Sequence, residues 1–168
     1  MNRLTPEEFR QAGKVPIIVV LDNVRSMHNV GAVFRTADAF LLEGVWLCGI
    51  TAKPGADEIH KTALGAENTV AWTYYNDTIA AVRALREQGY IVYAIEQAHG
   101  ATMLQDVRLE PGRKYAVVFG HEVFGVQQEV VDAADGCIEI PQYGTKHSLN
   151  VSVTAGIVIY QLATQLGF

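Results

Sequence analysis

Apolar, strand-like runs alternate with helix-like segments along the whole sequence, and this alternation limits the fold more than any other feature. The first run, Val15 to Leu21, is rich in β-branched side chains and contains no charged residue. A run of this kind is typical of a strand that helices cover on both faces. Because strands that alternate with helices form parallel sheets, the sequence predicts an α/β domain with a mainly parallel sheet flanked by helices.

The predicted elements follow one another without a linker or a composition shift, so we expect residues 1–168 to form a single domain. Strands are expected at residues 15–21, 44–50, 90–95, 114–119 and 137–140, and an additional short strand is an option near 68–72. Helices are expected at residues 5–12, 30–40, 57–66, 78–88, 127–134 and 151–166. The first helix begins with Thr5-Pro6-Glu7-Glu8, a capping box with proline at the first helical position.

Composition describes a globular protein, since 49% of the 168 residues are apolar and 18% are charged. No apolar run approaches the roughly 20 residues of a membrane helix, and the charged N-terminal segment lacks the apolar core of a signal peptide. Cys48 and Cys137 lie in strand-like runs without metal-ligand spacing, so we expect them to be buried and reduced. These features predict a cytoplasmic protein that does not enter a membrane.

Several common functional sites are absent from the sequence. No glycine-rich turn follows the first predicted strand, which argues against a dinucleotide-binding domain and a P-loop enzyme. No Gly-x-Ser-x-Gly occurs, and the five histidines lack metal-ligand spacing, so no metal site is expected. The formal net charge of −5 argues against strong non-specific binding of nucleic acid, because affinity for phosphate comes mainly from clustered Lys and Arg. Any nucleic-acid binding therefore requires a local basic patch.

Polar loops follow the predicted strands at residues 22–29, 96–100, 120–128 and 141–150, where the site of a parallel sheet is expected. The last loop is the richest, because Lys146, His147, Ser148 and Asn150 crowd the entrance of one helix. Ser148 and Asn150 are both suitable N-caps, yet one cap is enough to start a helix. The surplus suggests a polar ligand, which the N–H groups and dipole of a helix N-terminus favour.

Two other loops carry candidate residues. In the first, Asn29 fits as the N-cap of the following helix. Arg35 pairs with Asp38, extends its charged end to solvent, or binds a phosphate or a developing oxyanion. In the second, Gly120 lies at a strand end and allows a ligand to approach the backbone closely. Glu122 in that loop is a base, a hydrogen-bond acceptor or a solvated surface acid.

In combination, these loops resemble the three motifs of the SpoU–TrmH branch of the SPOUT RNA methyltransferases. The matching segments are Asn29–Ala39 (NVGAVFRTADA), Gly120–Gly125 (GHEVFG) and Ile140–Ser152 (with IPQYG and SLNVS), and Lys61–Ala66 (KTALGA) is a lesser fourth match. The resemblance covers nearly the whole chain. His121 stands where the family usually has Asn, and Gln142 where it often has Met, and these departures bear on substrate choice.

The resemblance implies S-adenosylmethionine as the methyl donor and a ribose 2′-hydroxyl of RNA as the acceptor. It implies a C-terminal trefoil knot over about residues 114–168, a feature too rare to expect from spacing. It also implies a homodimer, in which Arg35 reaches a site beside the partner's cofactor. The implied cofactor-binding residues, through their backbone, are Ile95, Gly120, Ile140 and Leu149. The implied catalytic residues are Asn29, Arg35, Glu122, Ser148 and Asn150.

Several alternatives accompany this resemblance. The hydroxyl proton can pass to Arg35, Glu122 or water, although a base role for Arg35 requires a group with a pKa above about 12 to lose its proton. Transfer RNA is favoured over ribosomal RNA because the chain lacks the separate N-terminal RNA-binding domain of many rRNA-modifying members. A non-catalytic relative that binds RNA or the cofactor and a small-molecule methyltransferase are the competing classes. The basic residues expected to hold RNA are Arg25, His28, Arg35, Lys53, Lys61 and Lys146.

Overall fold

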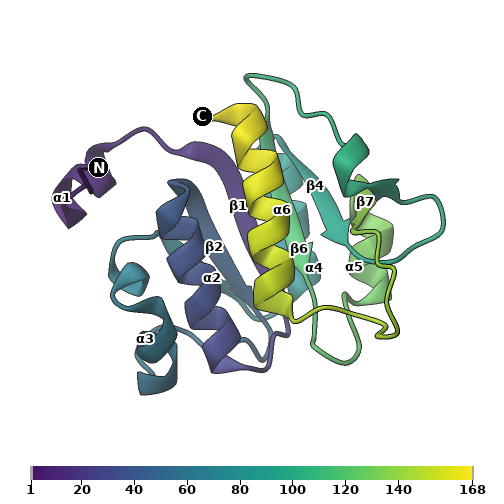
Figure 1. Ribbon diagram of the computed structural model, residues 1–168, viewed down its shortest axis with the longest axis horizontal. Coiled ribbons are helices and arrows are strands. Elements are labelled where there is room, and N and C mark those ends of the chain that lie inside the picture. The colour runs from purple at the N-terminus through teal and green to yellow at the C-terminus, as the bar shows by residue number, and fades with distance from the viewer. Residues whose placement is uncertain (1, 168) are drawn as a thin grey trace.

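The computed structural model describes residues 2–167 and contains the predicted parallel sheet between two layers of helices (Figure 1). The strands are β1 (Val15–Asp22), β2 (Leu42–Cys48), β3 (Trp72–Tyr75), β4 (Tyr90–Ile95), β5 (Thr102–Met103), β6 (Lys114–Phe119) and β7 (Gly136–Glu139). Their order in the sheet is β3-β2-β1-β6-β4-β7-β5, and all neighbouring strands are parallel. The expected α/β class is confirmed.

Helices cover both faces of this sheet. They are α1 (Pro6–Gln11), α2 (Met27–Ala39), α3 (Asp57–Ala63), α4 (Thr78–Glu87), α5 (Gln128–Ala133) and α6 (Val151–Leu166). α2 and α6 lie on one face, in front of the sheet in Figure 1, and α4 and α5 lie on the other. Among residues 2–167, no helix has the length and apolar character that crossing a membrane requires.

The central position of β1 explains its continuous apolar sequence. Ile17, Val19 and Leu21 point into the core beneath α2 and α6. Ile18 and Val20 point into the core beneath α4 and α5. Because successive side chains of a strand face opposite sides, a strand covered on both faces is apolar at each position. All five side chains are buried, so the sheet is stabilised mainly by apolar surface removed from water.

The entrance of α2 differs from the prediction. The helix expected at residues 30–40 begins at Met27 and ends at Ala39. Ser26 is its N-cap, because the Ser26 hydroxyl accepts a hydrogen bond of 3.2 Å from the N–H of Asn29. The prediction that Asn29 caps this helix is therefore wrong. Asn29 instead lies in the first turn, where it is buried.

Differences also occur at the edges of the sheet. The additional strand near residues 68–72 is β3, which begins only at Trp72, because residues 66–68 form a 3-10 turn. β5 has no counterpart among the predicted strands, since two residues carry no recognisable periodicity. Cys48 is buried as expected, whereas Cys137 is only half-buried. The knot over about residues 114–168 stays a prediction.

Candidate functional site

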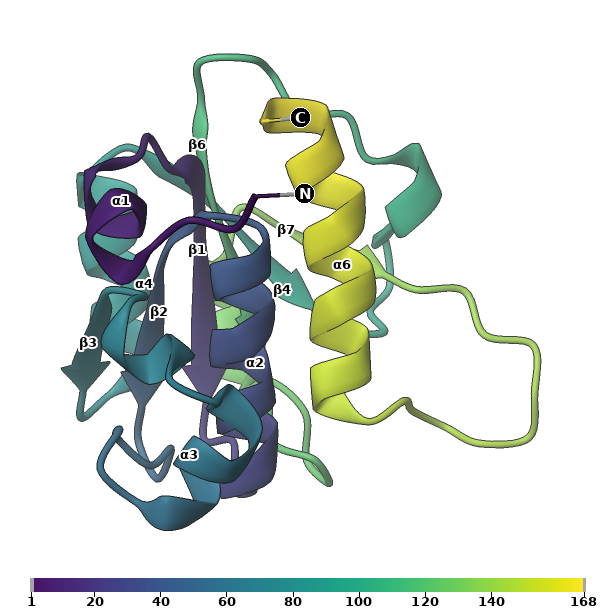
Figure 2. The ribbon, with the colours of Figure 1, turned by 60° about the vertical axis from the view of Figure 1, so that its left-hand side comes forward.

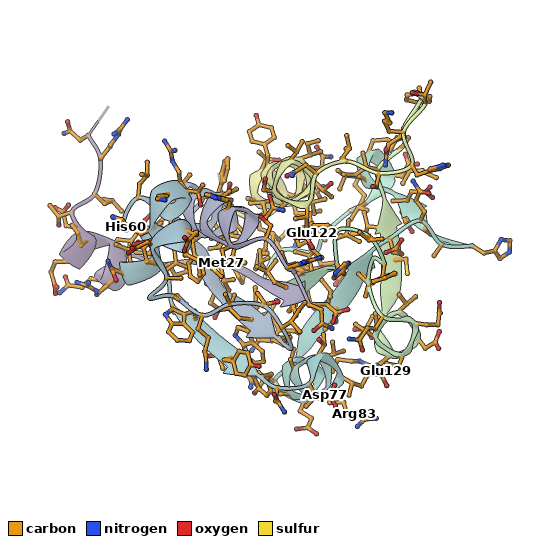
Figure 3. All side chains as sticks on the ribbon, turned by 90° about the horizontal axis from the view of Figure 1, so that it is seen from below. Met27, His60, Asp77, Arg83, Glu122 and Glu129 are labelled. Atoms are coloured by element: carbon orange, nitrogen blue, oxygen red, sulfur yellow. The ribbon has the colours of Figure 1, made fainter. Side chains whose placement is uncertain are left out.

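A cavity of about 300 Å³ opens at the carboxyl ends of β4, β6 and β7. These three strands are neighbours in the sheet, so the loops that follow them meet at one edge. The cavity walls are drawn from the stretches 95–97, 119–125, 138–142 and 147–154. Figure 3 looks onto this edge of the sheet, and Glu122 lies toward its middle.

The carboxylate of Glu122 joins the β6–α5 loop to the N-terminus of α2. Its Oε2 accepts a hydrogen bond of 3.0 Å from the N–H of Arg25. Its Oε1 accepts hydrogen bonds of 2.9 Å from the N–H of Ser26 and 3.3 Å from Nδ2 of Asn29. The free N–H groups and the dipole of a helix N-terminus favour an anion at this place. Two predicted site residues, Asn29 and Glu122, are thus in direct contact.

These hydrogen bonds determine the charge of Glu122. Partial burial alone would raise the pKa of its carboxyl group, because burial disfavours the charged form. The hydrogen bonds from Ser26, Arg25 and Asn29 outweigh burial and hold the pKa of Glu122 below its ordinary value. Glu122 is therefore ionised at neutral pH, and both of its oxygens already accept hydrogen bonds.

Two residues directly after β4 hold the other loops of the cavity together. Oε2 of Glu96 accepts a hydrogen bond of 3.0 Å from the N–H of Val126. Nε2 of Gln97 donates a hydrogen bond of 3.1 Å to the carbonyl oxygen of His147, before α6. Neither Glu96 nor Gln97 was among the predicted site residues. Their place immediately after a predicted strand is the signal that could have identified them.

Two glycines allow the β6–α5 loop to fold back on itself. A Cβ on Gly120 would lie 2.1 Å from the carbonyl carbon of Gly125. Gly125 has a φ of +71°, and a Cβ there would lie 2.5 Å from Oε2 of Glu96. A larger residue at either position would require the backbone or Glu96 to move.

The four residues expected to hold the cofactor, Ile95, Gly120, Ile140 and Leu149, all line the cavity. The backbone N–H and C=O of Leu149 make no hydrogen bond with any residue between 2 and 167. These two groups can therefore bind a ligand, while the apolar side chains offer surface to a flat ring. The residues present fit the adenosyl group of S-adenosylmethionine.

Ser148 and Asn150 take different places at the entrance of α6. Ser148 is exposed and lines the cavity. Oδ1 of Asn150 accepts hydrogen bonds of 2.9 Å from the N–H of Ser152 and 3.3 Å from the N–H of Val153, so Asn150 is the N-cap. The loop that leads into this helix, residues 142–150, is exposed throughout and projects away from the sheet (Figure 2).

Arg35 does not lie in the cavity of its own chain. It is exposed on α2, and its guanidinium makes no hydrogen bond or ion pair with the described residues. The alternative in which Arg35 pairs with Asp38 is not seen. Oδ2 of Asp38 instead accepts a hydrogen bond of 2.6 Å from the hydroxyl of Thr69. Within residues 2–167, no group of three His, Cys, Asp or Glu side chains could hold a metal ion.

The sequence is similar to known proteins over most of its length. A model of the SpoU rRNA Methylase family matches residues 16–160. The chain is 33% identical over 160 residues to the tRNA (guanosine(18)-2′-O)-methyltransferase of Thermus thermophilus, which covers 95% of this chain and 80% of the relative. It is 34% identical over 149 residues to the 23S rRNA (guanosine-2′-O-)-methyltransferase RlmB of Nitrosomonas europaea, which covers 89% of this chain and 56% of the relative.

A solved structure supports the same relationship. The AdoMet-bound rRNA methyltransferase of Sinorhizobium meliloti matches this fold with a TM-score of 0.82 and 27% sequence identity. The match covers 95% of this chain and 60% of that chain. Two of the motifs that suggested the resemblance, residues 120–125 and 140–152, form walls of the cavity. The third motif, residues 29–39, reaches them through the hydrogen bond from Asn29 to Glu122. The chain therefore belongs to the SpoU rRNA Methylase family, in the SpoU–TrmH branch of the SPOUT RNA ribose 2′-O-methyltransferases.

Proposed function

We propose that this protein transfers a methyl group from S-adenosylmethionine to a ribose 2′-hydroxyl of transfer RNA. The observation that carries the proposal is one cavity walled by two of the family motifs, residues 120–125 and 140–152, with Glu122 hydrogen-bonded to Asn29 of the third motif. S-adenosylmethionine, when bound, supplies an electrophilic methyl group on sulfur. The protein must then align the ribose oxygen with that group and provide a route for the hydroxyl proton.

Glu122 is a positioning residue in this proposal. Its lowered pKa makes it a weak base, and its oxygens already accept hydrogen bonds from Arg25, Ser26 and Asn29. Asn29 is buried and donates its Nδ2 to Glu122, so in this proposal it holds the carboxylate in place. The exposed hydroxyl of Ser148 lines the cavity and is the group offered to the ribose, and a water molecule takes the proton.

Arg35 acts from the second protomer of a homodimer. Its free guanidinium is exposed and lies outside the cavity of its own chain, which leaves it available to a site on another molecule. A guanidinium is permanently charged and binds phosphate or a forming alkoxide well. In the dimer, Arg35 would orient the phosphate next to the methylated ribose and stabilise the developing charge.

The outer face of α6 supports the dimer. Val153, Ile157 and Tyr160 are exposed by 50%, 41% and 59%, and their spacing places them on one stripe of the helix. Beside this stripe lies an open groove of about 510 Å³, to which Ile140 and Pro141 contribute. A contiguous apolar surface of this kind is typical of an interface, and we assign it to a second copy of the chain.

Transfer RNA is the preferred substrate because the tRNA-modifying relative aligns with this chain over a larger share of its own length than the rRNA-modifying relative does. Ribosomal RNA is the second candidate, since the identity to the rRNA-modifying relative is similar. We also place the protein in the cytoplasm, where the free thiols of Cys48 and Cys137 would stay reduced.

The test is methyl transfer from labelled S-adenosylmethionine into unmodified total tRNA and, separately, into unmodified rRNA, followed by mapping of the product nucleotide. We expect a 2′-O-methylated ribose in tRNA. Label in rRNA alone would replace the substrate assignment. Calorimetric titration with S-adenosylmethionine, combined with the transfer assay, separates the other classes. Binding of S-adenosylmethionine without methyl transfer indicates a non-catalytic relative. Consumption of S-adenosylmethionine without RNA indicates a small-molecule methyltransferase.

A further inference from the structure

Phe124 is an exposed aromatic side chain at the rim of the cavity, and the proposed reaction gives it no role. It belongs to the β6–α5 loop and lines the cavity, yet 83% of its surface is exposed. Its ring centroid lies 4.9 Å from that of the His121 imidazole, and the two planes differ by 27°. One face of Phe124 therefore packs on His121, and the other face is open.

The loop holds this aromatic pair in place. Nδ1 of His121 accepts hydrogen bonds of 3.0 Å from the N–H of Val123 and 3.2 Å from the N–H of Phe124. The backbones of His121 and Gly125 exchange two hydrogen bonds, of 3.0 and 2.8 Å, across the same loop. A side chain presented by a loop closed in this way is pre-organised, so little entropy is lost when a ligand stacks on it.

Building on the proposed function, we infer that the His121–Phe124 pair stacks on an unpaired RNA base at, or directly next to, the methylated ribose. A ribose whose 2′-hydroxyl enters the cavity brings its base to the rim where Phe124 lies. Unpaired bases stack on aromatic side chains, whereas the bases of a helix already stack on one another. The substrate nucleotide therefore lies in a loop or is turned out of a helix.

The charge of the protein adds to this argument. With a formal net charge of −5, the chain gains limited affinity from general attraction to phosphates. Stacking between a base and an aromatic ring requires no positive charge and contributes comparably for each base type. A rigid aromatic ring beside the reaction centre supplies affinity at the place where the electrostatic contribution of the whole chain is weak.

The exposed ring of Phe124 could also be covered by a second copy of the chain in a dimer. The apolar stripe assigned to the dimer contact lies on α6 beside the groove that includes Pro141 and Tyr160, whereas Phe124 lies on the rim of the cofactor cavity. Because the substrate must pass this rim, RNA rather than a second copy is the occupant that the position of Phe124 favours.

Three substitutions at position 124 separate stacking from other effects. Phe124→Trp keeps an aromatic face, Phe124→Leu keeps apolar volume without such a face, and Phe124→Ala removes both. The probes are fluorescein-labelled oligouridine, the same strand annealed to oligoadenosine, and unmodified tRNA. We expect Phe124→Leu and Phe124→Ala to weaken single-strand binding by about 5- to 100-fold, while Phe124→Trp binds at least as well as the wild type.

Binding to the duplex should change less than binding to the single strand. The free energy of unfolding in urea should stay constant across the series, since the side chain of Phe124 is exposed. Equal single-strand affinities of Phe124→Leu and the wild type would overturn the inference. Dissociation of Phe124→Ala into monomers during sedimentation would also overturn it, since the second copy would then be the occupant. If the wild type methylates no RNA, the proposed function fails, whereas the measured RNA affinities still decide whether Phe124 stacks.

Discussion

Glu122 connects two parts of the site through one side chain. Its carboxylate satisfies N–H groups of Arg25 and Ser26 at the entrance of α2, and it holds the amide of Asn29 at the same time. The ionised form makes these hydrogen bonds, so the connection depends on pH. A base at this position would lose the connection each time it accepted a proton, which is a further reason to treat Glu122 as a positioning residue.

Replacement of Glu122 by Gln should destabilise the protein in a pH-dependent way. The pKa of Glu122 is lower in the folded protein than its ordinary value, so its ionised carboxylate stabilises the fold above the unfolded pKa of about 4.3. This stabilisation is lost as the pH falls through the folded pKa. We expect Glu122→Gln to lower the free energy of unfolding by about 1–2 kcal/mol at pH 7 in urea titrations. The difference between variant and wild type should shrink below about pH 4. A difference that stays constant from pH 7 to pH 3 would contradict the assigned role.

The thiol of Cys48 should be chemically inert in the folded protein. Burial raises the pKa of Cys48 to about 12, and the thiolate, which is the reactive form, is therefore negligible at pH 8. Burial also raises the pKa of Cys137, although its side chain is only half-buried. Labelling with a thiol reagent at pH 8 should modify Cys137 slowly and Cys48 only after denaturation. Rapid modification of Cys48 in the native protein would show that this part of the core opens.

At the scale of elements, the entrance of α2 shows what sequence patterns cannot resolve. Ser26 and Asn29 are both suitable N-caps, so local sequence does not decide which one starts the helix. The structure selects Ser26 because Glu122, far away in the chain, accepts hydrogen bonds from the N–H of Ser26 and from the side chain of Asn29. The loop before α2 was predictable as part of the site. Which of Ser26 and Asn29 caps the helix was not, because it depends on the contact with Glu122.

The entrance of α6 allows capping to be separated from the reaction. Asn150 caps the helix, whereas the hydroxyl of Ser148 makes no hydrogen bond with the described residues and faces the cavity. We expect Asn150→Ala to lower the free energy of unfolding by about 1 kcal/mol. Ser148→Ala should change it by less than about 0.5 kcal/mol and should lower the methylation rate. Denaturant unfolding and methyl transfer measured on both variants check this, and equal destabilisation by the two substitutions would contradict the assignment of the cap.

At the scale of the whole molecule, the class of fold was predictable but the arrangement of the strands was not. The apolar run of β1 indicated a strand covered on both faces, and both faces are covered. Apolar patterns alone did not indicate that β6 lies between β1 and β4, or that β7 lies between β4 and β5. Only the family resemblance brought the ends of β4, β6 and β7 together, through the cofactor-binding residues Ile95, Gly120 and Ile140. The cavity exists because β4, β6 and β7 are neighbours, so contacts between its walls, such as the hydrogen bond from Val126 to Glu96, followed only from the strand order.

The proposed dimer predicts that a charge on the outer face of α6 separates the protomers without unfolding them. Ile157 is 41% exposed in the single chain, so Ile157→Glu should be tolerated by the monomer and should be unfavourable in an apolar interface. Sedimentation should show a monomer that binds S-adenosylmethionine, since one chain supplies the whole cavity, but has lost methyl transfer. Ala80→Glu, at an exposed position of α4 on the opposite face of the sheet, is the matched control and should remain dimeric.

If Arg35 serves the partner's site, two inactive variants should complement each other. In a mixed dimer of Arg35→Ala and Ser148→Ala chains, one site combines an intact Ser148 with an intact Arg35 from the partner, and the other site lacks both. Random reassortment makes about half of the dimers mixed, so we expect about a quarter of the wild-type methylation rate, whereas each variant alone is inactive. The rate is measured after the variants have been mixed and allowed to exchange subunits, with Ile157→Glu added to one chain as a control that blocks pairing. If the mixture stays inactive while sedimentation shows mixed dimers, Arg35 acts within its own chain. Because Arg35 is exposed on α2 and lies outside the cavity, that result would require α2 to move toward the cavity.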